Sequence, residues 1–358
     1  MKADKNQPTN IQELICPVPH THKETVVIGH GSGGSMTHGL IQNIFQSRFN
    51  NKYLAEGNDA ARLNLAGFAS KLAVSTDSHV VSPLFFPGGD IGKLAIAGTV
   101  NDVAMLGAIP QYITAGFIIE EGFPIESLEN IIGSMADTCQ DAQVKIVAGD
   151  TKVVEKGKAD GLYINTTGIG LIPEGRQIGG QFAQPGDAVL ISGSLGEHAI
   201  AVLQARGELG FESGIQSDVA PLNHLINELL EEIPEVHVLR DPTRGGLATS
   251  LNEIACQSQV SIQLQEDQIP MQPNVRVACE MLGFDPLYLA NEGKVIIILP
   301  DDFADKAIAI LKQSPHGAMA ARIGTVSEQN PGQVLLQTAF GSTRMLHMLS
   351  GEILPRIC

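Results

Sequence analysis

Apolar residues recur along the first half of the chain with two different periods, which predict alternating strands and helices. The runs 72–76 and 112–119 have the β-branched, apolar character of strands. The stretch 91–108 between them is rich in small apolar residues and suits a closely packed helix. Apolar residues also repeat at helical spacing over 40–49 and behind Pro124. Further strands are predicted at 26–29, 145–148 and 162–166.

The second half of the chain repeats this mixture of strands and helices. The stretch 173–186, which carries proline and several glycines, predicts the join between the two halves. We therefore predict an α+β fold with two domains, residues 24–172 and 173–328. A polar leader, residues 1–23, precedes them, and a C-terminal segment, residues 329–358, follows. In the second domain we predict strands at 188–192 and 295–299, helices at 197–206, 218–233 and 247–256, and an apolar segment at 307–311.

Composition and charge narrow the class of protein. The chain has 358 residues, of which 43% are apolar, and this is enough to bury two cores. A net charge of -16 and a pI near 5.0 argue against nucleic acid or an anionic membrane as general partners. The longest aliphatic run, residues 295–299, is far too short to span a bilayer, and residues 1–22 lack the apolar stretch of a secretory signal. We expect a cytoplasmic protein.

The chain ends in a cysteine, Cys358, which sits in a tail stiffened by Pro355. The five cysteines are odd in number and lack zinc-site spacing, so neither a disulfide framework nor a structural zinc is indicated. A prenylation signal is excluded because no residue follows the cysteine. From Gly351 the tail could reach about 25 Å, which would let the thiol move between pockets as a carrier arm. The alternative is an ordinary frayed terminus.

A glycine-rich loop, Gly-His-Gly-Ser-Gly-Gly-Ser at residues 29–35, leads toward the helix predicted after residue 40. The backbone N–H groups of Gly33 and Gly34 could hold a phosphate there. The loop is not a P-loop, because the lysine and the Ser/Thr of that motif are missing. For His30 the alternative is a hydrogen bond within the loop.

Three aspartates occupy positions that suit a nucleotide-bound magnesium ion. Asp77 follows one predicted strand, Asp150 follows another, and Asp102 lies within the helical stretch 91–108. Hard oxygen ligands are those that magnesium prefers, although each aspartate alone has the alternative of a turn or cap residue. Four segments together favour the nucleotide site: Ser-Thr-Asp-Ser at 75–78, the run 86–102 that begins Phe-Pro-Gly-Gly-Asp-Ile-Gly-Lys, Ala-Gly-Asp-Thr-Lys at 148–152, and Arg-Asp-Pro-Thr-Arg-Gly-Gly at 240–246.

These segments, the glycine-rich loop, Ala-Asn-Glu-Gly-Lys at 290–294 and the terminal Pro-Arg-Ile-Cys resemble the HypE family of nickel-iron hydrogenase maturation factors. The likeness covers about residues 27–358, with no departure at the motif positions, and leaves the leader outside. The terminal tetrapeptide is specific to this family within the superfamily of aminoimidazole ribonucleotide synthetase and selenophosphate synthetase. The resemblance implies a PurM-like fold. Its first domain would bind ATP and Mg²⁺ and pair with a second copy into a dimeric β-barrel; its second would be an α/β sandwich followed by a flexible tail.

The resemblance also implies a reaction and its partners. A carbamoyltransferase, HypF, would place a carbamoyl group on the Cys358 thiol, and ATP would drive its dehydration to a thiocyanate. The cyanide would then pass to iron on a HypC–HypD complex. The site residues are Cys358, Lys152 and Glu292 for catalysis, Gly33, Gly34, Lys93, Asn101, Thr151 and Asp241 for ATP, and Asp59, Asp77, Asp102 and Asp150 for magnesium.

Lys152 and Glu292 are candidates for general bases, because the carbamoyl nitrogen must lose protons. A base needs a near-neutral pKa, which for either residue requires burial or a close charged partner. The alternatives are that Lys152 is an ordinary solvated lysine and that Glu292 caps a helix or lies in a loop. For Asp241 and Arg244 the alternative is an ordinary structural position at the N-terminus of a helix. Three functions remain distinct: a carrier enzyme, an ATP-dependent enzyme acting on a free small molecule, and a non-catalytic nucleotide-binding assembly protein. The terminal tetrapeptide favours the first.

Overall fold

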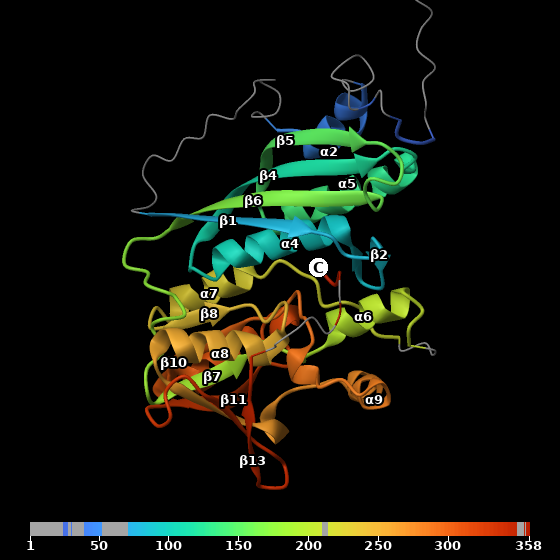
Figure 1. The fold of residues 1–358 in the computed structure, drawn as a ribbon. Coiled ribbons are helices and arrows are strands. Elements are labelled where there is room, and N and C mark those ends of the chain that lie inside the picture. Colours follow the sequence, from blue (N-terminus) through green and yellow to red (C-terminus); the bar gives the residue numbers. More distant parts are fainter. Residues whose placement is uncertain are drawn as a thin grey trace, which may run out of the picture.

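Two sheets, one from each half of the chain, form the framework of the molecule (Figure 1). The computed structural model describes residues 24–27, 30, 39–51, 71–209, 214–348, 354 and 356–358. Helices and strands mix in both halves, as the sequence predicts. Within these described ranges, no helix is both long and apolar enough to cross a membrane.

The first sheet has four strands. In spatial order they are β1 (Lys71–His79), β6 (Leu162–Ile172), β4 (Ile109–Glu120) and β5 (Lys145–Val154). β4 and β5 are parallel, while the other pairs are antiparallel. Helix α4 packs against β1 and β6, and α5 packs against α4 and β5. The two helices are α4 (Ile91–Ala104) and α5 (Ile125–Asp141). A short hairpin of β2 (Phe85–Phe86) and β3 (Gly89–Asp90) precedes α4.

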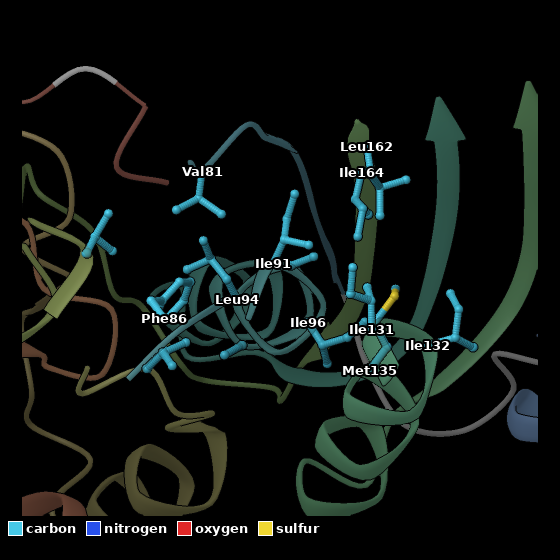
Figure 2. Close-up of a cluster of buried hydrophobic side chains, with 14 of the residues drawn as sticks. Val81, Phe86, Ile91, Leu94, Ile96, Ile131, Ile132, Met135, Leu162 and Ile164 are labelled. Atoms are coloured by element: carbon cyan, nitrogen blue, oxygen red, sulfur yellow. The ribbon is translucent and has the colours of Figure 1, made fainter. Parts of the chain in front are cut away.

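Helix α4 is buried along most of its length, which explains its small and apolar sequence. The Asp90 carboxylate caps it by accepting hydrogen bonds from the backbone N–H groups of Gly92 and Lys93. A Cβ on Gly92 would stand 2.4 Å from the carbonyl oxygen of Ile131, so glycine lets α4 approach α5 closely. Figure 2 shows the resulting core. Its labelled members include Ile91, Leu94 and Ile96 of α4, Ile131, Ile132 and Met135 of α5, and Leu162 and Ile164 of β6.

The second sheet has seven strands. In spatial order they are β13 (Thr343–Leu346), β12 (Val334–Gln337), β9 (Ser261–Gln265), β11 (Ala321–Ser327), β7 (Asp187–Ile191), β10 (Ile296–Pro300) and β8 (Val238–Arg240). The main helices are α6 (Glu197–Ala205), α7 (Asn223–Glu232), α8 (Gly246–Ser258), α9 (Pro273–Leu282) and α10 (Ala304–Leu311). Short 3₁₀ turns are η4 (Glu266–Gln268), η5 (Pro286–Tyr288), η6 (Asp301–Phe303) and η7 (Pro315–Gly317). Because β12 pairs with β9, residues 334–346 belong to this sheet, whereas the sequence division placed them in the C-terminal segment.

Two local predictions differ from the structure. The helix predicted over 218–233 begins only at Asn223, because Pro221 disfavours helical geometry at the residue before it. Of the strand predicted at 26–29, residues 26 and 27 are described and belong to no strand; the neighbouring Thr25 forms an isolated bridge to Pro124. The helix predicted over 40–49 is present, with η3 (Ile41–Gln46) as a π-helix followed by α2 (Ser47–Phe49).

One hydrophobic cluster spans the two halves. The core of the first domain continues into Ile200 of α6, Val275 of α9 and the penultimate residue, Ile357. At the same junction the buried Asn101 of α4 binds the second domain. Its amide donates to the carbonyl oxygens of Ala220 (3.0 Å) and Glu292 (3.4 Å), and its oxygen accepts from Leu222 N–H at 2.8 Å. The domains are therefore tied together where the candidate site lies.

Candidate active site at the junction of the two domains

The end of the chain docks between the two domains. In Figure 1 the C-terminus lies between β2 and α6. Backbone N–H groups of the first domain bind the tail: Val80 N–H donates to a terminal oxygen of Cys358 (3.3 Å), and Ser82 N–H donates to the carbonyl of Arg356 (3.1 Å). The Ile357 side chain is buried in the core, and the Cys358 side chain packs against that core while remaining partly exposed. The described end of the tail therefore occupies a defined place.

Two side chains, one on α6 and one at the C-terminal end of this helix, bind carbonyl groups of the tail. His198 Nε2 lies 2.8 Å from the Ile357 carbonyl oxygen. Arg206 contacts the Arg356 carbonyl through Nη2 (2.6 Å) and the Ser82 carbonyl through Nε (2.6 Å). Arg356 binds back, because its Nε donates to the Val80 carbonyl at 3.1 Å. Its guanidinium also forms an ion pair with Asp160.

Glu292 lies in a loop that is fixed by a buried carboxylate. Asp218 accepts hydrogen bonds from the backbone N–H groups of Glu292 and Gly293, both at 3.1 Å. The Lys294 ammonium lies 3.2 Å from the same carboxylate, and its charge holds the pKa of Asp218 below its ordinary value although burial alone would raise it. The Glu292 side chain is only 4% exposed, and its Oε1 has no hydrogen-bond partner among the described residues. This oxygen is therefore buried without a partner among the described residues.

Carboxylates from both domains converge near this loop. Burial raises the pKa of Glu292 well above its ordinary value of 4.5, and repulsion from Asp218, Asp241, Asp77 and Asp102 adds to the shift. Burial also raises the pKa of Asp241, to about 7, again with repulsion from Asp102. The pKa of Asp102 is raised by burial, although the Ser75 hydroxyl donates a hydrogen bond to this carboxylate at 2.7 Å. Such a cluster favours the binding of a cation.

A hollow of about 320 Å³ opens between the domains at these carboxylates. Its walls come from β1, α4, the start of the second domain and the end of β8, and they include Ser75, Asp102 and Asp241. Asp77 lies two residues beyond Ser75 and faces α4, because its carboxylate would be 3.8 Å from a Cβ on Gly98. The structure thus brings Asp77 and Asp102 to one β1–α4 interface and places Asp241 across from them.

The structure does not bring Asp150 and Lys152 to this cluster within one copy of the chain. They lie on β5, three strand steps from β1, or roughly 14 Å at the usual strand spacing. Both side chains are well exposed, and Lys152 Nζ binds both Asp150 oxygens, at 2.6 and 2.7 Å. This contact holds the pKa of Asp150 below its ordinary value. Thr151 between them is buried.

The other predicted ATP and magnesium residues have different placements. Lys93 Nζ donates to the Gly88 carbonyl at 3.1 Å, and Asn101 uses its amide to hold backbone of the second domain. The alternative for His30 is present, because its Nδ1 accepts from Val27 N–H at 3.0 Å. No group of three potential metal-ligand side chains is assembled within the ranges that the structure describes. Three predicted residues lie outside the described residues: Gly33, Gly34 and Asp59.

Sequence reasoning missed three residues of the site: His198, Asp218 and Lys294. The predicted helix over 218–233 gave Asp218 no role, yet its carboxylate holds the Glu292 loop 74 residues away. His198 lies near the start of a helix where its apolar neighbours suggest only packing, and it is fully buried. The signal that could have drawn attention to Lys294 is its place in the same Ala-Asn-Glu-Gly-Lys motif as Glu292.

Gly293→Ala should disturb the loop that carries Glu292. A Cβ at this position would stand 1.8 Å from the Asp218 carbonyl oxygen, so the loop would have to move. We expect a loss of about 1 to 3 kcal/mol, the usual range for overpacking, visible as a lower melting temperature. Gly39→Ala is the matched control, because nothing lies within 4 Å of its added Cβ and it sits in a helix. Equal melting temperatures for the two variants would contradict this view of the loop.

Comparisons with known proteins fit this architecture. Residues 57–172 match the family model "AIR synthase related protein, N-terminal domain", and residues 184–337 match its C-terminal counterpart. The fold and the junction site thus have the two-domain organisation of AIR synthase related, PurM-like proteins. Carbamoyl dehydratase HypE of Cupriavidus necator is 52% identical over 331 residues, which cover 92% of this chain and 94% of the relative. The chain belongs to the HypE family of hydrogenase maturation proteins.

Two solved structures of this family are informative. A HypE crystallised in complex with ATP is 51% identical, with a TM-score of 0.90, and the match covers 93% of this chain and all of that one. The HypE chain of a HypE–HypF complex is 49% identical, with a TM-score of 0.76, over 87% of this chain and 99% of that one.

Proposed function

We propose that this chain dehydrates a carbamoyl group on the Cys358 thiol to a thiocyanate, using ATP, and so supplies cyanide for the iron of nickel-iron hydrogenases. The observation that carries the proposal is the terminal cysteine docked at the domain junction, where the adjacent residues Ser217 and Asp218 hold the tail through His198 and the backbone of the buried Glu292. The carbamoyl dehydratase name of the relatives and the ATP complex of a family member support it. The acidic chain would act in the cytoplasm.

The proposed reaction needs oxygen to leave carbon as phosphate. The carbamoyl oxygen attacks the γ-phosphorus of ATP, ADP departs, and the nitrogen loses one proton. The carbon–oxygen bond then breaks, phosphate leaves, and loss of the second proton gives the carbon–nitrogen triple bond. The sum is carbamoyl thioester plus ATP giving thiocyanate, ADP, phosphate and one proton. The protein must therefore position the two reactants and accept protons from nitrogen.

Glu292 is the proton acceptor that the geometry supports best. Its raised pKa makes the ionised carboxylate a stronger base than an ordinary glutamate, and its Oε1 is free of hydrogen bonds among the described residues. Glu292 and the tail are also held by adjacent residues. Ser217 contacts the His198 ring that binds Ile357, while Asp218 holds the Glu292 backbone. We propose that this arrangement places the carbamoyl nitrogen near Glu292.

The described carboxylates do not assemble a group of three ligands by themselves, so a magnesium ion would need further ligands besides them. Asp77, Asp102 and Asp241 provide hard oxygen donors, and their mutual repulsion in a buried setting would be relieved by a cation. Bound there, Mg²⁺ would neutralise phosphate charge. We propose Asp77 and Asp102 as ligands together with Asp59. Gly33, Gly34, Lys93, Asn101, Thr151 and Asp241 remain the proposed ATP residues.

We propose that Asp150 and Lys152 serve the site from a second copy of the chain. Register places Lys152 beside Ile118, and Asp150 beside Gly116, on one face of the first sheet. The same face exposes Val74 (61%) and Leu72 (50%), large apolar residues that a homodimer would cover. Formation of the dimeric barrel would bury this face. HypF, for which a complex with a similar HypE is solved, is the proposed carbamoyltransferase, and a HypC–HypD complex is the proposed cyanide acceptor.

Asp77→Asn and Asp102→Asn should each abolish ATP-driven dehydration while leaving carbamoylation of Cys358 intact. Each replacement keeps the side-chain shape and removes the negative charge, so the fold should survive. Each variant is incubated with HypF, with the carbamoyl donor that HypF uses and with ATP. Intact-mass measurement then distinguishes the carbamoyl adduct from the product that has lost water. Asp137→Asn is the control, because Asp137 is exposed on α5. Loss of both steps in the Asp77 and Asp102 variants would count against a role in ATP chemistry.

A further inference from the structure

The last three residues are held largely through their main chain. The carbonyl of Arg356 is bound by Ser82 N–H and Arg206, the carbonyl of Ile357 is bound by His198, and a terminal oxygen of Cys358 is bound by Val80 N–H. These bonds join residue 80 to residue 358 and residue 82 to residue 356. The tail therefore runs antiparallel to residues 80–82, just beyond the end of β1. Hydrogen bonds to the main chain fix the position of the peptide with little dependence on its side chains.

The contacts of His198 define its tautomer. A carbonyl oxygen only accepts hydrogen bonds, so Nε2 must carry the proton that it donates to Ile357. The Nδ1 atom is then an acceptor, and the Ser217 hydroxyl, 2.8 Å away, donates to it. Ser217 Oγ in turn accepts from Val219 N–H at 3.1 Å. Burial holds the pKa of His198 below its ordinary value, which agrees with this neutral, singly protonated ring.

Arg206 joins the tail to the first domain. One edge of its guanidinium reaches two carbonyls on different segments, Ser82 beside β1 and Arg356 in the tail. A lysine ammonium carries the charge but lacks this planar fork. The contact therefore depends on the shape of arginine as well as on its charge.

We propose that His198 and Arg206 are positioning residues that clamp the carbonyl groups of the C-terminal peptide and thereby set the place of the Cys358 thiol. The clamp continues into the catalytic loop, because Ser217, which orients His198, precedes the Asp218 that holds Glu292. One short segment, residues 217–218, thus contributes both to docking of the tail and to placement of Glu292. This catalytic consequence rests on the proposed function, whereas the docking itself does not.

Trimming by a carboxypeptidase tests the clamp without any catalytic readout. The protease must take the tail into its own cleft, so it acts only on chains whose tail has undocked. Intact-mass measurement over time gives the rate at which Cys358 and Ile357 are removed. We expect Arg206→Met to be trimmed about tenfold faster than wild type or more, since hydrogen bonds from charged donors are among the stronger ones. Arg206→Lys should also be faster, whereas Arg322→Met, which removes an arginine paired with Asp301 far from the tail, should not.

A matched pair at His198 tests the same clamp by another route. His198→Gln retains an N–H donor near the Nε2 position, whereas His198→Asn places its amide near Nδ1 and leaves the Ile357 carbonyl without a donor. We expect faster trimming for the asparagine variant and near wild-type trimming for the glutamine variant. Melting temperatures establish that the variants are folded, and the His198 pair decides alone if an Arg206 variant is not.

Wild-type trimming rates for Arg206→Met and His198→Asn would overturn the clamp. The proposed function is tested separately, by dehydration in protein that already carries the carbamoyl group. Faster trimming with unchanged dehydration would retain the clamp and remove its catalytic consequence. Slower dehydration without faster trimming would instead remove the clamp. Absence of any carbamoyl adduct on wild-type Cys358 would reject the proposed function and leave the trimming result standing.

Discussion

Cys358→Ser should acquire no carbamoyl adduct and form no thiocyanate when it is incubated with HypF, its carbamoyl donor and ATP. The replacement keeps the length of the side chain and the main-chain contacts of the tail, so docking should persist. A serine hydroxyl, however, is a far weaker nucleophile than a thiol at neutral pH. Intact mass, followed by mapping of the C-terminal peptide, measures the adduct. We expect complete loss, the largest effect of any substitution considered for this chain.

Cys256→Ser is the control for Cys358, because Cys256 is a second accessible thiol, exposed where Cys358 is partly exposed. It should be carbamoylated as wild type is. Cys139 and Cys279 are buried, and burial raises the pKa of their thiols to about 12 and about 11, so they are poor nucleophiles. A carbamoyl adduct of normal yield on Cys358→Ser would show that another group is the carrier.

Glu292→Gln should slow dehydration by about 10² to 10⁴-fold while ATP binding stays nearly unchanged, the range expected for loss of a positioned proton acceptor. Glutamine keeps the shape of the side chain but cannot accept the proton. Single-turnover dehydration, measured on protein that already carries the carbamoyl group, isolates this step. Weak ATP binding with normal dehydration at saturating ATP would remove Glu292 from the proton-transfer role.

The pH dependence of dehydration gives a second test of Glu292. Because burial among other carboxylates raises its pKa, the ionised form appears at a higher pH than for an ordinary glutamate. The single-turnover rate should therefore rise with pH through a value above 4.5, and Glu292→Gln should lose this rise. Burial raises the pKa of Asp241 to about 7, so this carboxylate is a second source of such a rise. A rise that persists in Glu292→Gln and disappears in Asp241→Asn would be assigned to Asp241.

Lys152→Ala separates two roles for the exposed lysine. If Lys152 serves the active site of a second copy, mixing Lys152→Ala with Glu292→Gln chains should restore activity in mixed dimers that hold one intact site. If it acts within its own copy, mixing should restore none. Its close contact with Asp150 keeps both side chains on the uncovered sheet face in one copy. Dehydration in the mixture, compared with each variant alone, provides the measurement.

Local sequence patterns predicted the elements whose residues lie close together along the chain. The apolar run of β1 and the small apolar residues of α4 specify these elements, and packing of α4 on β1 brings Asp77 near Asp102. Strands such as β12 escaped prediction because they are short and depend on distant partners. Val334 pairs with Ile262, and no local pattern specifies that register.

The same limit applies to the site. The terminal cysteine and the Glu292 motif were visible in the sequence, because both stand out from their neighbours. Docking of the tail beside residues 80–82 was not, since hydrogen bonds between backbone groups leave no trace in residue type. The sequence likewise could not show that Lys152 lies away from Asp77 and Asp102, because its place follows from the strand order of the first sheet.

The core shared by the two domains has a mechanical consequence. Hinge opening between them would expose Ile200 and Val275 to water and break all the bonds of Asn101, so it would carry a large free-energy cost. The two halves should therefore move as one rigid body during turnover. Under the proposed function, the carbamoyl group on Cys358 would then reach a partner by release of residues 356–358 from their docked place, without opening of the two domains.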